Sequence, residues 1–211
     1  MSATADDYVR AVENGDLGLA EHYGQQLDAP VELEAAWVER DDAMLVTALY
    51  YVRQGLAVLP LTPGSKVPLG DRDGCCGGSH RRGVTDASTD PAYVAGWWRE
   101  HPTANLGIAT GRRVDVIDQD GPTGALSWAR IGRAEAWPAV LGIVCTPRSG
   151  GVHRYVRATG DGNGAKVAPG IDYRGAGGYV VAPPSVVNGH RYRWVQPLDI
   201  AARTVVAGAG R

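Results

Sequence analysis

The chain has 211 residues, 44% of them hydrophobic and 21% charged, which is typical of a globular protein with one large domain or one domain and a small appendage. It has no long apolar run, no signal-peptide core and three cysteines, so we expect a cytoplasmic protein without membrane spans or a disulfide framework. Residues 1–60 carry 11 acidic and 3 basic side chains, whereas residues 61–211 carry 12 and 18. A basic body of this kind suits phosphate-bearing partners, although chance clustering of solvated charge gives the same count.

The first part of the chain has the patterns of helices. Residues 30–55 start with a proline and end at a glycine, with apolar residues at helical spacing between them. The segment "LAVLPLTPG" is typical of a buried strand that breaks into a turn, and the Gly-rich residues 64–88 are predicted to form a long loop. We therefore expect a helical N-terminal cap over residues 1–52 and a core over residues 53–211.

The rest of the chain alternates between helix and strand patterns. A helix is predicted to begin at Pro91, capped by Asp90, and "GPTGALSWARIGRAEAW" predicts another. Strands are expected in "NLGIATG", in "RVDVIDQD" and in several short segments after residue 170, and "GIVCTPRSGGVHRYVRA" predicts a hairpin that turns at residues 149–151. This order predicts an α+β fold with a mixed or antiparallel sheet and helices on one side.

The strand-like segment "RVDVIDQD" contains three aspartates, which is an unusual load of carboxylates for a sheet. Because successive side chains of a strand point to opposite faces, Asp118 and Asp120 share one face and Asp115 lies on the other. Two carboxylates at this spacing can hold one or two hard divalent ions. The structural alternative is a pair of acidic side chains satisfied by arginines or water.

Two later segments add groups that can contact phosphates or metals. The turn at residues 149–151 leaves backbone N–H groups that can face an anion, and His153 follows on the next strand, although a plain turn with a surface histidine has the same pattern. In "GIDYRGAGGYVVAPPS", Asp172 and Arg174 share a strand face. They form either an ion pair or a metal ligand beside a phosphate-binding arginine.

Taken together and in this order, "DQD", "SGGVH" and "IDYRGAGGYVVAPPS" resemble the three motifs of the archaeo-eukaryotic primase superfamily. The chain looks most like the bifunctional primase-polymerase (prim-pol) domains of phages and plasmids. The flanking segments "GLAVLPLTPGSKVPL" and "GHRYRWV" resemble the lead-in and exit segments of that family. The resemblance covers about residues 50–197 and does not clearly cover the first 45.

The resemblance implies a mixed-sheet primase-polymerase core, RRM-like in part, that copies single-stranded DNA from NTP or dNTP during phage or plasmid replication in a bacterial cell. It implies that Asp118, Asp120 and Asp172 hold two Mg²⁺ or Mn²⁺ ions and that Ser149 and His153 contact the nucleotide's phosphates. Further candidates for triphosphate or template contacts are Gly150, Gly151, Arg148, Arg174 and Lys66.

Some members of this family carry a zinc-binding insertion near the long loop, and this sequence departs from that pattern. Cys75 and Cys76 are adjacent, which makes a poor tetrahedral pair, and with His80 they still lack a fourth ligand, so we do not expect zinc. Tyr173 and Tyr179 could pack on a base or sugar, with core packing as the alternative. No GxxxxGK[ST] motif is present, so we expect any helicase partner elsewhere in a longer chain or on another chain.

Two other functions use the same residues. A two-metal nuclease would need the same three aspartates, but it has no triphosphate to hold at the glycine turn. A non-catalytic module that binds DNA at a replication origin would not need the full set of carboxylates.

Overall fold

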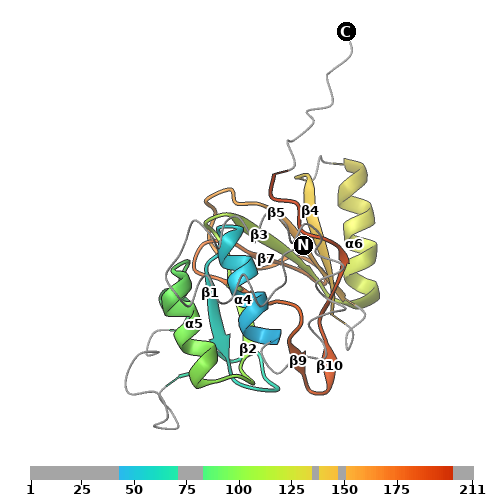
Figure 1. Ribbon diagram of the computed structural model, residues 1–211. Helices are drawn as coiled ribbons and strands as arrows, with labels where there is room; N and C mark the ends of the chain where they lie inside the picture. Colours follow the sequence, from blue (N-terminus) through green and yellow to red (C-terminus); the bar gives the residue numbers. More distant parts are fainter. Residues whose placement is uncertain (1–42, 71–82, 135–137, 147–150, 202–211) are drawn as a thin grey trace, which may run out of the picture.

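The computed structural model describes residues 43–70, 83–134, 138–146 and 151–201 (Figure 1). Its helices are α4 (Ala43–Arg53), the short 3₁₀ helix η2 (Gly83–Asp86), α5 (Pro91–Glu100) and α6 (Gly121–Ala134). Its strands are β1 (Val58–Leu61), β2 (Asn105–Ala109), β3 (Val114–Gln119), β4 (Val140–Thr146), β5 (Gly151–Arg157), β6 (Gly164–Ala168), β7 (Ile171–Arg174), β8 (Tyr179–Val181), β9 (Val186–Val187), β10 (His190–Arg191) and β11 (Arg193–Gln196).

The strands form three sheets. A six-stranded sheet has the order β11-β4-β5-β3-β7-β6, a three-stranded sheet has the order β1-β2-β8, and β9 and β10 form a short hairpin. Every pairing between these described strands is antiparallel. The predicted α+β class is therefore confirmed. The described sheets are antiparallel and not mixed as the resemblance implies, and helices cover both faces of the large sheet and not one side.

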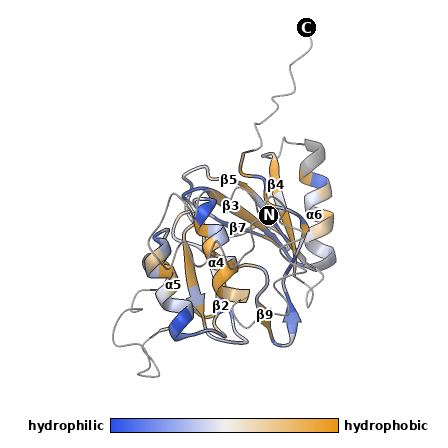
Figure 2. Cartoon of the chain, viewed as in Figure 1, coloured by the Kyte–Doolittle hydropathy of each residue, from blue (hydrophilic) through white to orange (hydrophobic). Residues whose placement is uncertain are grey.

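The six-stranded sheet has a different cover on each face. On one face, Ile117, Val156 and Ile171 form a small cluster with Trp128 and Ile131 of α6. On the other face, β3, β4 and β5 contribute to the main hydrophobic cluster, which also includes α4, α5 and the three-stranded sheet. Figure 2 shows that α4 is hydrophobic through most of its length, in agreement with its seven buried residues.

Several predicted elements are confirmed. Asp90 caps α5 by accepting hydrogen bonds from the backbone N–H groups of Ala92 and Tyr93, at 2.9 and 3.2 Å. The predicted hairpin is formed by β4 and β5, with Thr146 opposite Gly151. None of the described helices is long and apolar enough to cross a membrane.

Helix α4, which the sequence placed at the end of the N-terminal cap, packs into the main core. The hydroxyl of Tyr51 donates to the carbonyl of Pro183 at 3.0 Å and accepts from Nε1 of Trp194 at 2.8 Å. Residues 1–42, which make up most of the predicted cap, lie outside the described residues, so the boundary at residue 52 stays a prediction. The candidate zinc ligands Cys75, Cys76 and His80 lie outside them as well.

The chain crosses between the two larger sheets at two places that touch each other. Residues 110–113 lead from β2 to β3, and residues 175–178 lead from β7 to β8. Thr110 donates its hydroxyl to the carbonyl of Gly175 at 2.6 Å, and its backbone N–H donates to Gly178 at 2.9 Å. Gly111 has a φ of +90°, and a Cβ at this position would overlap Ala176. These contacts join the two larger sheets where the chain passes between them.

Candidate active site

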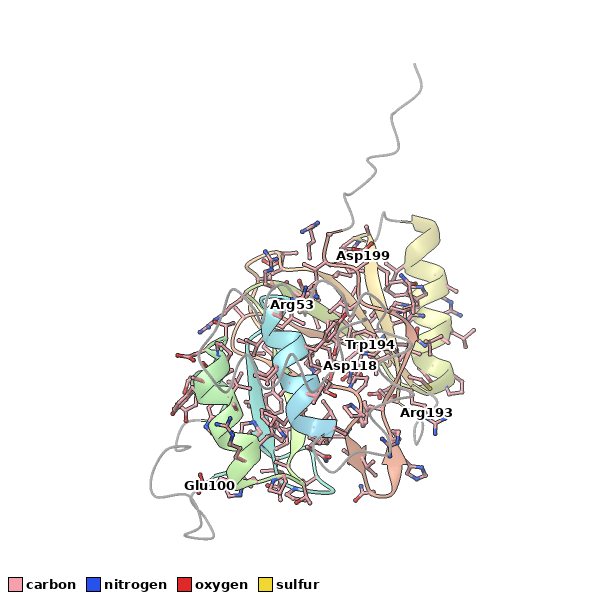
Figure 3. All side chains as sticks on the ribbon, viewed as in Figure 1. Arg53, Glu100, Asp118, Arg193, Trp194 and Asp199 are labelled. Carbon is pink, nitrogen blue, oxygen red and sulfur yellow. The ribbon has the colours of Figure 1, made fainter. Side chains whose placement is uncertain are left out.

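Three candidate residues meet on neighbouring strands of the large sheet. Strand β3 lies between β5 and β7, and the register places Asp118 opposite His153 on one side and opposite Asp172 on the other. Directly opposed residues of a sheet project from the same face, so the three side chains form a row. Figure 3 shows Asp118 in the middle of the molecule, whereas Glu100 and Asp199 lie at its margins.

Arg174 connects the two aspartates of this row. Its Nη2 lies 2.9 Å from Oδ2 of Asp172 and 3.3 Å from Oδ2 of Asp118. Like charges that face each other across two strands repel, and the guanidinium offsets that repulsion. The carboxylates are only partly buried, with exposed fractions of 17% for Asp118 and 24% for Asp172, so both remain accessible to a ligand.

Asp120 lies between β3 and α6, exposed but within electrostatic reach of the row. Its pKa is raised by partial burial and by the negative charges of Asp118 and Asp172, while Lys66 and Arg174 act in the opposite direction. The three carboxylates therefore repel one another, and a divalent cation among them would relieve that repulsion.

The carboxylates of the site have the right donor atoms for a hard metal ion, but they are not arranged around one position. Asp118, Asp120 and Asp172 supply the oxygen ligands that Mg²⁺ and Mn²⁺ prefer. Among residues 43–70, 83–134, 138–146 and 151–201, however, no group of three or more His, Cys, Asp or Glu side chains is gathered closely enough to hold one ion. Arg174 lies where two of the carboxylates converge, so any ion they hold must compete with the guanidinium.

His153 is the buried member of this row. Its Nε2 lies 3.5 Å from Oδ1 of Asp118, and its Nδ1 has no hydrogen-bond partner among the described residues. Burial lowers its pKa to about 4, against the opposing influence of Asp118 and with the help of Lys66 and Arg174. The imidazole is therefore neutral at pH 7, and it can contact a phosphate as a hydrogen-bond donor but not as a cation.

A cavity of about 250 Å³ opens beside the row, at the seam between the two larger sheets. Strand β8 and the preceding glycines form one wall, and the large sheet forms the other. The backbone carbonyl of Lys66 accepts a hydrogen bond from the hydroxyl of Tyr179 at 3.0 Å, which ties the loop after β1 to this wall. The lining residues are Lys66, Asp118, His153, Asn163, Arg174, Gly177, Gly178, Tyr179, Val180, Val181 and Tyr192.

The structure brings together most of the described candidates. The cavity is lined by Lys66, Asp118, His153 and Arg174. Asp172 does not line it but forms an ion pair with Arg174. Gly151 is buried at the start of β5. Arg148, Ser149 and Gly150 lie outside the described residues.

The two tyrosines considered for base or sugar contacts separate. Tyr179 lines the cavity, whereas Tyr173 packs on the α6 face of the sheet. The alternation of side chains along β7 explains this result, because Tyr173 must point away from its neighbours Asp172 and Arg174.

Two lining residues with polar side chains, Tyr192 and Asn163, were not singled out in the sequence. Tyr192, between β10 and β11, is buried, with its ring centroid 5.7 Å from that of His153. Asn163 lies against Gly178, where a Cβ would clash with its side-chain oxygen. The resemblance of "GHRYRWV" to a family exit segment is the signal in the sequence that includes Tyr192. The sequence has no such signal for Asn163.

An α+β domain with carboxylates on adjacent strands, a neutral buried histidine and two cations around one cavity has the composition of a site for a phosphorylated ligand. The family model described as "Bifunctional DNA primase/polymerase, N-terminal" matches residues 48–204. The chain therefore belongs to this prim-pol family, and the family resemblance predicted from the sequence is confirmed. The search of curated proteins finds no match to the chain.

Proposed function

We propose that the chain is a template-dependent DNA primase/polymerase that transfers nucleotidyl groups from NTP or dNTP by a two-metal mechanism. The observation that carries the proposal is the row of Asp118, His153 and Asp172 on three adjacent strands, facing a cavity that Lys66 and Arg174 also line. Family membership supports the reaction class, and the row supplies groups that suit it.

Asp118, Asp120 and Asp172 would hold two Mg²⁺ or Mn²⁺ ions, with no role for zinc. Such ions supply activation of the attacking 3′-hydroxyl and charge neutralisation on the leaving pyrophosphate. Burial raises the pKa of Asp120 most, and the negative charges of Asp118 and Asp172 raise it further. The second contribution supports this assignment, because it marks an excess of negative charge in one place.

The remaining groups would bind and orient the nucleotide's phosphates. Lys66 and Arg174 bring positive charge to the cavity, and the neutral His153 can donate one hydrogen bond. The segment between β4 and β5 contains Arg148, Ser149 and Gly150, and the turn predicted there, which includes Gly151, would add backbone N–H groups and a further cation. Phosphoryl transfer depends mainly on such positioning and charge stabilisation.

The substrate strand would be single-stranded DNA, in phage or plasmid replication within the cytoplasm of a bacterial host. The excess of 18 basic over 12 acidic side chains in residues 61–211 supports contact with a nucleic-acid backbone. A helicase would act with this domain, either on further sequence of the same chain or on another protein.

The test is a synthesis assay on single-stranded templates, with and without a primer, with NTP or dNTP and with Mg²⁺ or Mn²⁺. We expect new or extended strands from the wild type and none from the Asp118→Ala/Asp120→Ala double variant. The Arg193→Gln variant is the control, because Arg193 is an exposed cation on an edge strand outside the cavity. Shortened strands would favour a nuclease, and template binding without any metal-dependent product would favour a non-catalytic module.

A further inference from the structure

Arg174 holds two carboxylate oxygens through a single nitrogen atom. Its Nη2 lies within 3.3 Å of Oδ2 of both Asp118 and Asp172. The two aspartates are direct register partners on β3 and β7. Their Oδ2 atoms therefore converge on one point, and the guanidinium nitrogen occupies that point.

A metal ion that bridges the two aspartates through these oxygens would need the same place. Mg²⁺ binds carboxylate oxygens at about 2.0–2.1 Å, so a bridging ion would lie between the two Oδ2 atoms, where Nη2 is. Two cations cannot share that position. Because a guanidinium keeps its proton at every physiological pH, the arginine cannot give up the place by titration and has to move.

The surroundings of Arg174 offer a second position for its side chain. Arg174 is 30% exposed and lines the cavity together with Lys66, so its head group has solvent-accessible space on the cavity side. The planar fork of a guanidinium matches the oxygens of a phosphate better than it matches two carboxylates reached through one nitrogen. A triphosphate in the cavity would therefore compete with Asp118 and Asp172 for the arginine.

We propose that Arg174 is an exchangeable counter-ion, which closes the Asp118–Asp172 pair to bare metal ions until the phosphates of a nucleotide draw the guanidinium away. This inference rests on the proposed function and adds an order of binding to it: metal ions enter the pair with the nucleotide or after it. The chain would then not hold a bridging metal ion while it has no substrate.

The first half of the test measures binding of Mn²⁺ alone to the full chain, by the electron paramagnetic resonance signal of the unbound ion. We expect Arg174→Gln to bind Mn²⁺ about tenfold more tightly than the wild type, because a positive charge next to two carboxylates has been removed. Arg174→Lys, which keeps the charge, and Arg193→Gln, which removes an exposed charge outside the cavity, should both resemble the wild type. The gain in affinity should disappear when Asp118→Ala and Asp120→Ala are added to Arg174→Gln.

The second half measures binding of a fluorescent nucleoside triphosphate in the presence of EDTA. Arg174→Gln should bind it more weakly than the wild type, again about tenfold, while Arg193→Gln should not change. Melting curves show whether each variant is folded, and Arg174→Met provides a second neutral replacement if Arg174→Gln is not.

Equal Mn²⁺ affinity in Arg174→Gln and the wild type would overturn the inference, as would equal affinity for the triphosphate. Neither readout depends on synthesis. A wild type that makes no DNA but shows both shifts would refute the proposed function and leave the counter-ion exchange in place. If the wild type makes DNA but its affinities for Mn²⁺ and triphosphate equal those of Arg174→Gln, the proposed function stands and the counter-ion exchange is refuted.

Discussion

Asp115 and Asp118 lie three residues apart on β3, yet they project from opposite faces of the sheet into different environments. Asp115 is fully buried on the α6 face, where its carboxylate accepts hydrogen bonds from the backbone N–H groups of Gly111 and Thr159 and from the hydroxyl of Tyr173, at 2.9, 2.8 and 2.6 Å. Asp118 is 17% exposed on the cavity face, between a neutral histidine and a shared guanidinium.

The difference separates a carboxylate with fixed partners from one that is open to a ligand. Buried donors that surround a carboxylate satisfy its charge and fix it in place. A partly exposed carboxylate whose charged partner is a single movable side chain can exchange that side chain for a ligand. The environment of each aspartate, more than its residue type, therefore indicates its role.

The largest effect should follow from changes on the cavity face. Asp118→Ala should reduce synthesis by about 10³-fold or more, because it removes a ligand for ions that stabilise the transition state by several kcal/mol. The free energy of unfolding should change by only about 1 kcal/mol, since the variant loses an ion pair and a like-charge contact together. Primer extension and urea denaturation measure the two quantities. A large loss of stability would show that Asp118 is structural too.

The matched change on the other face should have the opposite profile. Asp115→Ala leaves three donors without their acceptor and should cost about 3–5 kcal/mol of unfolding free energy. At this chain length that corresponds to a fall of about 10 °C in Tm. Synthesis by the molecules that stay folded should persist. If Asp115→Ala abolished synthesis without lowering Tm, the division between the faces would be wrong.

The pH dependence of stability should reveal the buried imidazole. The pKa of His153 is about 4 in the folded protein, against 6.5 for an ordinary histidine, because burial disfavours the charged form. The unfolded chain therefore binds a proton first, and stability is lost as the pH falls from 6.5 towards 4. The loss should reach about 3 kcal/mol.

Carboxylates also titrate in this range, so the measurement compares the wild type with His153→Gln. Only the difference between their unfolding free energies, followed from pH 7 to pH 4, reports His153. Parallel curves for the two proteins would show that the imidazole is not held neutral.

The smallest effect should separate the two tyrosines. Burial and the hydrogen bond to Asp115 raise the pKa of Tyr173 to about 12. Tyr173→Phe removes this donor and should cost about 1–2 kcal/mol of stability with no change in nucleotide KM. Tyr179→Phe removes the hydroxyl that ties down the Lys66 loop, so it should raise the KM and leave stability nearly unchanged. The reverse result would exchange the roles of the two faces.

The sequence was sufficient to predict features that depend on a single strand or a single helix end. Alternation along β3 separates Asp118 from Asp115, and the cap at Asp90 follows from its position before a proline. Contacts between strands were not accessible in this way, because a slip of one residue in the register of β3 against β5 or β7 would move every side chain to the other face. The three motifs of the family supplied that information by resemblance.

The residues that were missed reach the cavity from distant parts of the chain. Asn163 follows β5, and Tyr192 lies between β10 and β11, so only the three-dimensional fold brings them to Asp118. An asparagine and a tyrosine have no local pattern that indicates a binding site. The exchange of partners at Arg174 was equally hidden, because a spacing of two along a strand is compatible with an ion pair or with separate roles.

The touching crossovers at Thr110 and Gly175 have a consequence for how the molecule opens. Each crossover connects the two larger sheets, and the two crossovers contact each other. The sheets therefore cannot separate without breaking the hydrogen bonds of Thr110 and the close contact of Gly111 with Ala176. The two sheets should therefore exchange their amide protons as one cooperative unit. The two walls of the cavity should then unfold together and not one at a time.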